Sequence, residues 1–161
     1  MRNFPQGVTV VTYSSESGFE GVTVSSFTSI SLEPPLILIS LAKGTKSNML
    51  LSLQDYFAVN LLAEDQKSVS DRFAGRDDIE ERFRGIKYSL TSRKLPIIAG
   101  SVAYLECRKY RWEDAGDHDI VLGEVLDGAV LNSKMPLVYH RQQYTLLSEP
   151  WSREEPFELF W

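Results

Sequence analysis

The chain has 161 residues, of which 43% are hydrophobic and 24% charged, a composition that predicts one globular domain over residues 1–161. Its formal net charge of −5 argues against a nucleic-acid-binding protein, because phosphate backbones attract a basic excess. No apolar run reaches the roughly 18 residues of a membrane span, and the N-terminal residues do not read as a signal peptide. We therefore expect a cytoplasmic protein without membrane partners.

Residues that commonly bind metal ions are scarce. The single cysteine, Cys107, excludes an intramolecular disulfide and a cysteine zinc cluster. The two histidines, His118 and His140, are too few for a histidine-built metal site. Apolar neighbours of Cys107 predict a buried thiol in a strand rather than a catalytic cysteine.

The first part of the chain predicts a hairpin followed by a buried strand. A β-branched run over Gly7–Tyr13 is typical of a strand, and Ser14–Gly18 has the composition of a turn. A hydroxyl-rich strand over Gly21–Pro35 follows, ended by its two prolines. The run Leu36–Leu41 is apolar on both faces, which predicts a central strand covered on both sides.

A helix and a second buried strand come next. Thr45 is a suitable N-cap for a helix over Lys46–Gln54. Tyr56–Leu62 predicts a strand buried on both faces. One side of the helix would carry its larger apolar residues, Met49, Leu50 and Leu53.

The second half predicts two short helices and more strands. Helices are expected over Glu64–Phe73, closed by Gly75, and over Asp77–Phe83. Strands are expected over Gly85–Ser89, Ser101–Trp112 and His118–Val125. Lys94–Gly100 is expected to be a loop between the first two of these strands, and Pro136–Leu146 a last hairpin or loop. The tail, Glu149–Trp161, has no packing pattern that assigns it a role.

This order of elements favours a mainly β fold with peripheral helices. Strands are not regularly followed by helices, which argues against a doubly wound parallel sheet. A Gly-x-Gly-x-x-Gly dinucleotide fingerprint is absent from the sequence. A closed antiparallel barrel fits the pattern best, because closure removes exposed strand edges.

Three polar clusters interrupt this pattern. In the stretch Gly21–Pro35, side chains alternate between an apolar face and a face carrying Thr23, Ser25, Phe27, Ser29 and Ser31. The hydroxyl face either contacts water or holds a polar ligand through hydroxyls and closely approaching backbone. The second cluster, at the turn into the first helix, is Lys43, Thr45, Lys46, Ser47 and Asn48.

The second cluster suits a phosphate, because hydroxyls, a lysine and helix-terminal amides donate to anions. The alternative is an ordinary capped helix with a solvated lysine. The third cluster is Gly116-Asp117-His118-Asp119, at a turn between two long strands. His118 is either an exposed turn residue or a ring that contacts a ligand.

The joint spacing of these clusters resembles a known family, the short-chain flavin reductases, which are the small reductase components of two-component flavin monooxygenases. The resemblance extends from about Phe4 to Leu147. It is carried by seven matches in the same order: Phe4–Thr12, Gly21–Pro35, Ser47–Leu50, Phe57–Leu62, Arg72–Gly75, Gly116–His118 with Leu122–Val125, and Pro136–Tyr144.

The resemblance implies a flavin-binding split β-barrel that binds FMN or FAD. The flavin ring would be lined by the hydroxyl stretch, through Thr23, Ser25, Ser26, Phe27, Ser29 and Ser31. The ribityl phosphate would meet Lys46, Ser47 and Asn48, with Arg72 joining from the end of the next helix. His118 would approach NADH or NADPH as the catalytic residue, with Asp117 placing it, and Arg141 and Tyr144 would close the site.

The activity implied is NAD(P)H-dependent reduction of a flavin that is then supplied to a separate oxygenase, by a homodimeric protein. Two alternatives stay open at this point. One is a flavin-binding protein without reductase turnover, such as an electron carrier or flavin sensor. The other is a different enzyme on the same barrel, such as an oxidase of a vitamin B6 phosphate. Because a fold alone does not determine function, the site must decide between them.

Overall fold

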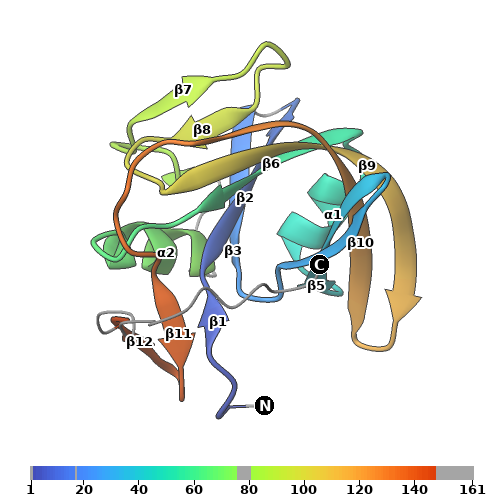
Figure 1. The fold of residues 1–161 in the computed structure, drawn as a ribbon. Helices are drawn as coiled ribbons and strands as arrows, with labels where there is room; N and C mark the ends of the chain where they lie inside the picture. The colour runs from blue at the N-terminus through green and yellow to red at the C-terminus, as the bar shows by residue number, and fades with distance from the viewer. Residues whose placement is uncertain (1, 17, 76–80, 148–161) are drawn as a thin grey trace.

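The structure is a computed structural model that describes residues 2–16, 18–75 and 81–147 (Figure 1). Its largest element is a seven-stranded antiparallel sheet with strand order β3-β2-β6-β9-β10-β5-β4. The strands of this sheet are β2 (Thr9–Ser15), β3 (Gly18–Val24), β4 (Thr28–Leu32), β5 (Pro35–Ala42), β6 (Tyr56–Leu61), β9 (Ala103–Ala115) and β10 (His118–Val130). The sheet curves around the core (Figure 1).

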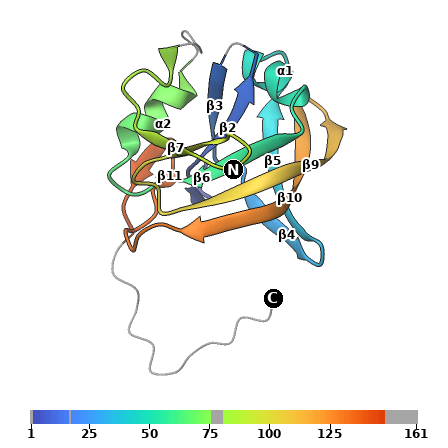
Figure 2. The ribbon, with the colours of Figure 1, turned by 90° about the horizontal axis from the view of Figure 1, so that it is seen from above.

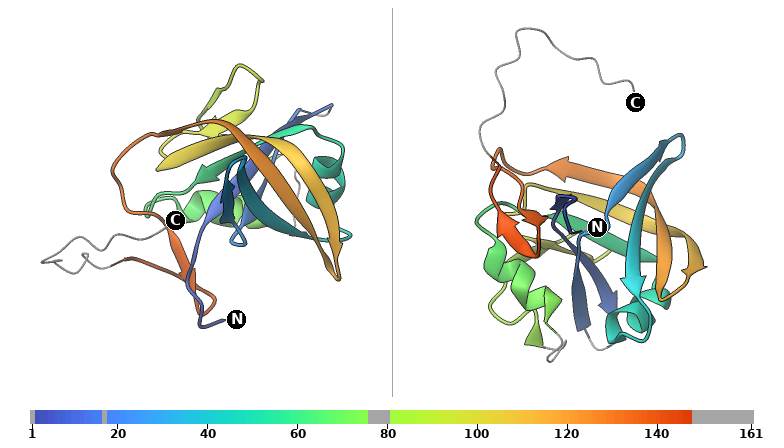
Figure 3. Two further views of the ribbon diagram at one scale, coloured as in Figure 1. Left: turned by 45° about the vertical axis from the view of Figure 1, so that its right-hand side comes forward. Right: turned by 90° about the horizontal axis from the view of Figure 1, so that it is seen from below.

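The other elements are short and lie around this sheet. They are β1 (Gln6–Gly7), β11 (Val138–His140) and β12 (Gln143–Thr145), which form a small sheet, the pair β7 (Tyr88–Leu90) and β8 (Pro96–Ile98), and the helices α1 (Lys46–Ser52) and α2 (Lys67–Ala74). The helices lie on opposite sides of β2 and β3 (Figure 2). The hairpin of β11 and β12 stands beside α2 (Figure 3). The mainly β fold with peripheral helices is therefore confirmed.

The two edge strands of the main sheet, β3 and β4, are consecutive in the chain and joined by residues 25–27. The prediction of one continuous hydroxyl-rich strand over Gly21–Pro35 was therefore wrong. The break is stabilised by Ser26, whose hydroxyl donates to the Ser40 carbonyl (3.1 Å) and accepts from the Ser40 amide (2.8 Å). These two bonds hold residues 25–27 against β5, and no backbone pairing between described residues joins β3 to β5.

This connection makes the barrel incomplete. Among the described residues, β3 pairs with β2 alone, so its other edge is not closed onto β4 or β5 by backbone hydrogen bonds. The closed barrel expected from the strand pattern is thus open along one line, which we call the seam: β3 and residues 25–27 on one side, and the end of β5 on the other. An open seam is consistent with a split barrel.

The main core lies inside the curved sheet. Its fully buried side chains include Val11, Tyr13, Ile39 and Phe57. Cys107 belongs to the same cluster, and burial raises the pKa of its thiol to about 12. The prediction of a buried cysteine is confirmed, and a thiol with that pKa is a poor nucleophile at neutral pH.

Thr45 caps α1 as predicted, because its hydroxyl accepts a hydrogen bond from the Asn48 amide (3.2 Å). The buried face of the helix, however, is not the predicted one. Leu51 is buried, whereas Met49 and Leu53 are more than half exposed. The helix ends at Ser52 rather than Gln54 and presents positions 47 and 51, one turn apart, to the core. β5 likewise buries one face only, because its alternate residues, such as Leu38, stay partly exposed.

The segment predicted as a loop over Lys94–Gly100 contains a strand, β8. Buried side chains make this possible: the Asn60 side-chain carbonyl accepts from the Ile98 amide (2.8 Å), and the Thr12 hydroxyl donates to the Pro96 carbonyl (2.6 Å). Proline is tolerated at the first position of a short edge strand.

The remaining helix predictions were partly right. α2 begins at Lys67 rather than Glu64, with Gln66 at its N-cap and no acidic residue in its first turn, and it ends before Gly75 as expected. The Asp77–Phe83 helix falls largely outside the described residues, and the tail Glu149–Trp161 lies wholly outside them. In the described part of the chain, neither helix has the length and apolar character that crossing a membrane requires.

Gly123 provides a test of the core packing. A Cβ added there would lie 2.6 Å from the Phe57 ring and 3.2 Å from both Cys107 and Ile37. Overpacking a core forces side chains and backbone to shift, so Gly123→Ala should lower the free energy of unfolding by about 1 to 3 kcal/mol in urea denaturation. The control Gly7→Ala meets no atom within 4 Å and should change it by less than about 0.5 kcal/mol. Equal effects of the two variants would contradict this packing.

Candidate functional site

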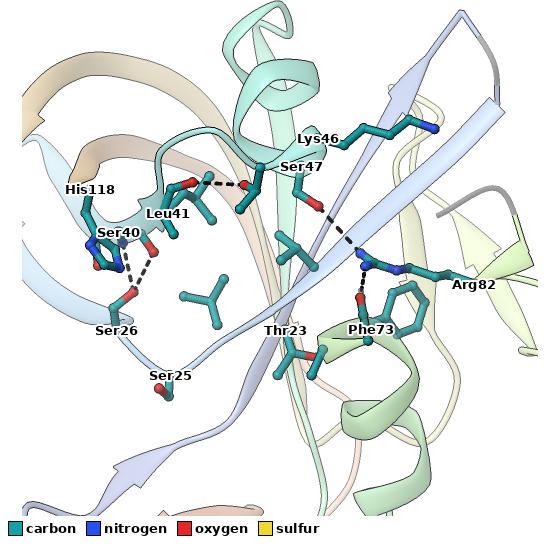
Figure 4. Close-up of a pocket in the computed structure, with 16 residues that line it drawn as sticks. Thr23, Ser25, Ser26, Ser40, Leu41, Lys46, Ser47, Phe73, Arg82 and His118 are labelled. Atoms are coloured by element: carbon teal, nitrogen blue, oxygen red, sulfur yellow. Dashed lines mark hydrogen bonds between the residues drawn. The ribbon is translucent and has the colours of Figure 1, made fainter. Parts of the chain in front are cut away.

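A cavity of about 590 Å³ opens along the seam. One wall is β3 and the residues after it, Val22 to Ser26, and the facing wall is the end of β5, Ser40 to Ala42. The start of α1 and the end of α2 complete it, with Arg82 and His118 (Figure 4). Small residues therefore line the place where a strand edge has no neighbouring strand, and a planar ligand could approach that backbone closely.

The charged residues that line the cavity are all basic among the described residues. Among the described residues that line the cavity, Lys46 and Arg82 are cationic, and no carboxylate is present. The whole chain has 22 acidic and 17 basic residues, so this local excess runs against its overall charge. A cavity with this lining favours an anionic ligand.

His118 stands at one end of the cavity, near Ser26 and Ser40 (Figure 4). Its Nδ1 lies 2.8 Å from an Asp117 carboxylate oxygen, and this hydrogen bond lowers the pKa of Asp117 below its usual value. A carboxylate at Nδ1 favours the tautomer with the proton on Nδ1 and leaves Nε2 as an acceptor. The Asp117 side chain is 94% exposed and is not among the residues that line the cavity.

The cations stand at the opposite end, where the Ser47 hydroxyl points toward Arg82 and the Lys46 side chain extends away from the other lining residues (Figure 4). Ser47 is 3% exposed, in the first turn of α1. Arg82 is 6% exposed and follows α2 in the chain. Its Nη1 donates to the Gly21 carbonyl (2.7 Å) and lies 3.5 Å from the Ser47 hydroxyl, and its Nη2 donates to the Gly75 carbonyl.

Burial lowers the pKa of Arg82, because desolvation disfavours the charged form. Glu20 and Tyr13 lie close enough to oppose this effect electrostatically. An arginine side chain remains protonated at neutral pH even so. The guanidinium therefore carries a buried positive charge beside the cavity.

The structure brings together six of the residues predicted for the site from the sequence: Thr23, Ser25, Ser26, Lys46, Ser47 and His118. Thr23 is fixed by its hydroxyl, which donates to the Ser70 carbonyl in α2 (2.7 Å). Thus the hydroxyl stretch does line a cavity, although only its first half does so. The role of each residue stays a prediction.

The other predicted residues lie outside the lining. Phe27 packs against the main core, and Ser29 and Ser31 belong to β4, beyond the strand break. Asn48 donates to the Asp119 carboxylate (2.8 Å) instead of facing the cavity. Arg72 donates to the Arg84 carbonyl.

The terminal segment is also set apart from the cavity. Arg141 donates to Asn3 (3.0 Å), at the turn between β11 and β12. The Tyr144 hydroxyl donates to the Asp71 carboxylate (2.8 Å) and accepts from the Ser70 hydroxyl (2.9 Å), so Tyr144 contacts α2. Any effect of Tyr144 on a ligand would pass through Ser70, which also holds Thr23.

Sequence reasoning missed Arg82 and Ser40, and at the end of α2 it selected Arg72 instead of Phe73, Ala74 and Gly75. Arg82 lies in a stretch of charged residues, Arg76 to Arg84, where no pattern separates one arginine from the others. Ser40 offered a signal, because it is the one hydroxyl residue in the apolar run Leu36–Leu41. A polar residue inside a buried strand requires a hydrogen-bond partner, which is Ser26 here.

Comparisons with known proteins agree with this arrangement. Residues 1–148 match the model of the family described as flavin reductase like domain. FMN reductase (NADH) SmoA of Agrobacterium fabrum is 40% identical over 126 residues, which cover 78% of this chain and 71% of that protein. The flavin-dependent monooxygenase reductase subunit HsaB of Rhodococcus jostii is 35% identical over 142 residues, covering 88% and 72%.

Solved structures give the same result. NADH:FAD oxidoreductase SgcE6 of Streptomyces globisporus, in complex with NAD and FAD fragments, superposes with a TM-score of 0.87 at 34% identity and covers 94% of this chain and 90% of that one. Flavin reductase HpaC complexed with NADP⁺ has a TM-score of 0.84 at 36% identity, covering 91% and 93%. The family match and these relatives confirm the resemblance seen in the sequence: the chain belongs to the flavin reductase-like family.

Proposed function

We propose that this protein is an NAD(P)H-dependent flavin reductase, which transfers hydride from a reduced nicotinamide to FMN or FAD and supplies the reduced flavin to a separate monooxygenase component. The observation that carries the proposal is the seam cavity, with a histidine at one end, cations at the other and no carboxylate among its described lining residues. Family membership and relatives named as flavin reductases and monooxygenase reductase subunits support it.

The residues present fit a phosphorylated flavin. Flavin rings carry acceptors along one edge and present flat faces, which suit a strand edge lined by small hydroxyl residues. Thr23, Ser25 and the backbone beside them form that edge, on the cavity wall made by β3 and the residues after it. When bound, the flavin supplies the hydride-accepting chemistry, and the protein supplies binding, orientation and electrostatics.

Lys46 and Ser47 would hold the phosphate end. They lie at the end of the cavity away from His118 (Figure 4). The Asn48 amide is already taken by the Thr45 cap, and the Lys46 and Ser47 side chains are donors offered there. A dianionic phosphate is stabilised by charge-assisted hydrogen bonds of this kind.

His118 would orient the nicotinamide. Its ring is held through Nδ1 by Asp117, so Nε2 keeps a defined direction and an acceptor character. Hydride transfer between two bound rings needs alignment and exclusion of water more than an acid or base. We therefore assign His118 a binding and aligning role toward the nicotinamide, with no proton transfer required of it.

We also infer a homodimer, in the cytoplasm, where reduced nicotinamide nucleotides are available. The surface that supports a dimer is the edge strand β4, which exposes Ile30 (50%) and Leu32 (69%) beside the partly exposed Leu36 and Leu38 of β5. An exposed apolar sheet edge favours association with another chain.

The direct test of the activity is nicotinamide oxidation by the purified protein, followed by the loss of NADH or NADPH absorbance. The rate should rise with added FMN or FAD and then saturate, because the flavin must bind to the protein before it accepts hydride. Absence of turnover with either nicotinamide, while flavin still binds, would favour a flavin carrier or sensor instead.

His118→Ala tests the assignment of the two ends of the cavity. Losing one hydrogen bond should raise the KM for the nicotinamide about 3- to 10-fold while changing the flavin Kd less than about 2-fold. His140→Ala is the matched control, because His140 lies on β11 outside the cavity lining. Equal weakening of flavin and nicotinamide by His118→Ala would refute the role given to His118.

Leu32→Asp tests the dimer surface. A charge on the β4 edge should shift the mass measured by sedimentation from dimer to monomer at micromolar concentration, because a desolvated carboxylate is costly. Leu53→Asp is the control, since Leu53 is similarly exposed (73%) at the end of α1. A wild-type monomer, or a Leu32→Asp dimer, would be inconsistent with this surface.

A further inference from the structure

We propose that Asn48 and Asp119 are positioning residues for His118, so that Asn48 acts on the nicotinamide end of the cavity and not on the flavin phosphate. The inference rests on the proposed function, because it concerns how the same site aligns its two ligands. It starts from the hydrogen bond between the two side chains, in which Asn48 Nδ2 donates to an Asp119 carboxylate oxygen (2.8 Å). The family resemblance implies a phosphate contact for Asn48 and gives Asp119 no role.

The Asn48–Asp119 pair joins the two ends of the cavity through chain neighbours. Asn48 follows Ser47 in the first turn of α1. Asp119 follows His118 at the start of β10. Ser47 and His118 both line the cavity, at opposite ends (Figure 4). The pair therefore ties the turn that carries the histidine to the helix that carries donors of the other end.

The His118 ring depends on this backbone for its place. Its Nδ1 bonds to Asp117, whose side chain is 94% exposed, and a surface pair of this kind orders a side chain weakly. The main chain is better fixed. The Lys43 amide donates to the Asp117 carbonyl (2.9 Å), and residues 118 and 119 pair with residues 42 and 41 of β5. These bonds fix the turn to the sheet, and the Asn48–Asp119 pair fixes it to α1.

Burial makes the pair strong enough for this task. Asp119 is 9% exposed, and a buried charge requires partners. One of its oxygens accepts from Asn48, and the Lys43 ammonium lies 3.7 Å from the other. Lys43 also pairs with Asp114, whose side chain is 81% exposed. A bond from an amide to a buried carboxylate is charge-assisted and directional, so Asn48 gives Asp119 its direction.

Loss of the Asn48 amide would remove a hydrogen bond from a buried charge. Such a loss is costly, and the start of β10 has to shift or admit water to offset it. A shift there moves His118, because the two residues are adjacent in one strand. Small misplacements of an aligning group slow a transfer between two bound rings.

The experiment measures nicotinamide oxidation at saturating flavin, and flavin Kd by fluorescence titration, in a double-mutant cycle of Asn48→Ala and His118→Ala. Asn48→Ala should lower kcat/KM for the nicotinamide about 2- to 5-fold, less than His118→Ala does, and change the flavin Kd less than about 2-fold. If Asn48 acts through His118, Asn48→Ala should have no further effect when residue 118 is alanine.

A charge swap provides the rescue. Asn48→Asp alone sets two carboxylates against each other and should impair nicotinamide use at least as much as Asn48→Ala. Adding Asp119→Asn restores an amide–carboxylate bond in the reverse direction and should recover most of kcat/KM. The swap also decides the matter if Asn48→Ala does not fold, which thermal melts report.

Gln54→Ala is the matched control. Gln54 follows the other end of α1, its side chain donates to the Leu50 carbonyl (3.1 Å), and it is absent from the cavity lining. It loses one hydrogen bond of the same helix and should leave kcat/KM and flavin Kd unchanged.

The outcomes separate this inference from the proposed function. Additive effects of Asn48→Ala and His118→Ala, or a swap that recovers nothing, would overturn the positioning role and leave the reductase proposal standing. Asn48→Ala that weakens flavin binding and spares nicotinamide use would also overturn it, in favour of a phosphate contact. Wild-type protein without flavin-dependent turnover would overturn the proposed function, and the inference with it.

Discussion

The open seam is the constraint on which the rest of the structure depends. The sheet begins at β3 and ends at β4, and these strands are joined by only three residues, so its two edges meet without pairing within the described chain. Ser26, in the connection between them, bonds to β5 through its hydroxyl, and the backbone of β3 faces a cavity instead of a second neighbouring strand. In most sheets an exposed edge is a liability; here it is the wall of the candidate site.

The two ends of the cavity differ in charge. Two aspartates near it bond to other side chains, Asp117 to His118 and Asp119 to Asn48, and no carboxylate is among the described residues that line the cavity. The cations gather at one end and the histidine stands at the other. A ligand with an anionic end and a flat ring therefore has one favourable orientation, which is what alignment of two reacting rings requires.

Much of the fold could be predicted from residue patterns. β-branched runs, the Thr45 cap and the terminal hairpin were found because each depends on local preferences. The break in the hydroxyl stretch could not be predicted, because alternation continues through Ser25–Phe27 and the break depends on a bond to Ser40, 14 residues away. β8 was also missed, because it depends on hydrogen bonds to Asn60 and Thr12, which are distant in the sequence.

In the site, too, residues in local motifs could be predicted and a residue placed by tertiary contacts could not. Thr23, Ser26, Lys46, Ser47 and His118 were identified from the sequence because they lie in short motifs close to the strand ends. Arg82 was not, because its place in the cavity lining comes from burial between β3, α1 and α2 rather than from its neighbours in the chain. Residues whose function depends on tertiary contacts leave no local signal.

The central claim is that flavin and nicotinamide share the seam cavity, and a crystal structure with FMN and oxidised nicotinamide nucleotide bound tests it most directly. The account predicts the flavin ring against the edge of β3, its phosphate at Lys46 and Ser47, and the nicotinamide between the ring and His118. A flavin bound elsewhere, or bound with its phosphate at the His118 end, would contradict it.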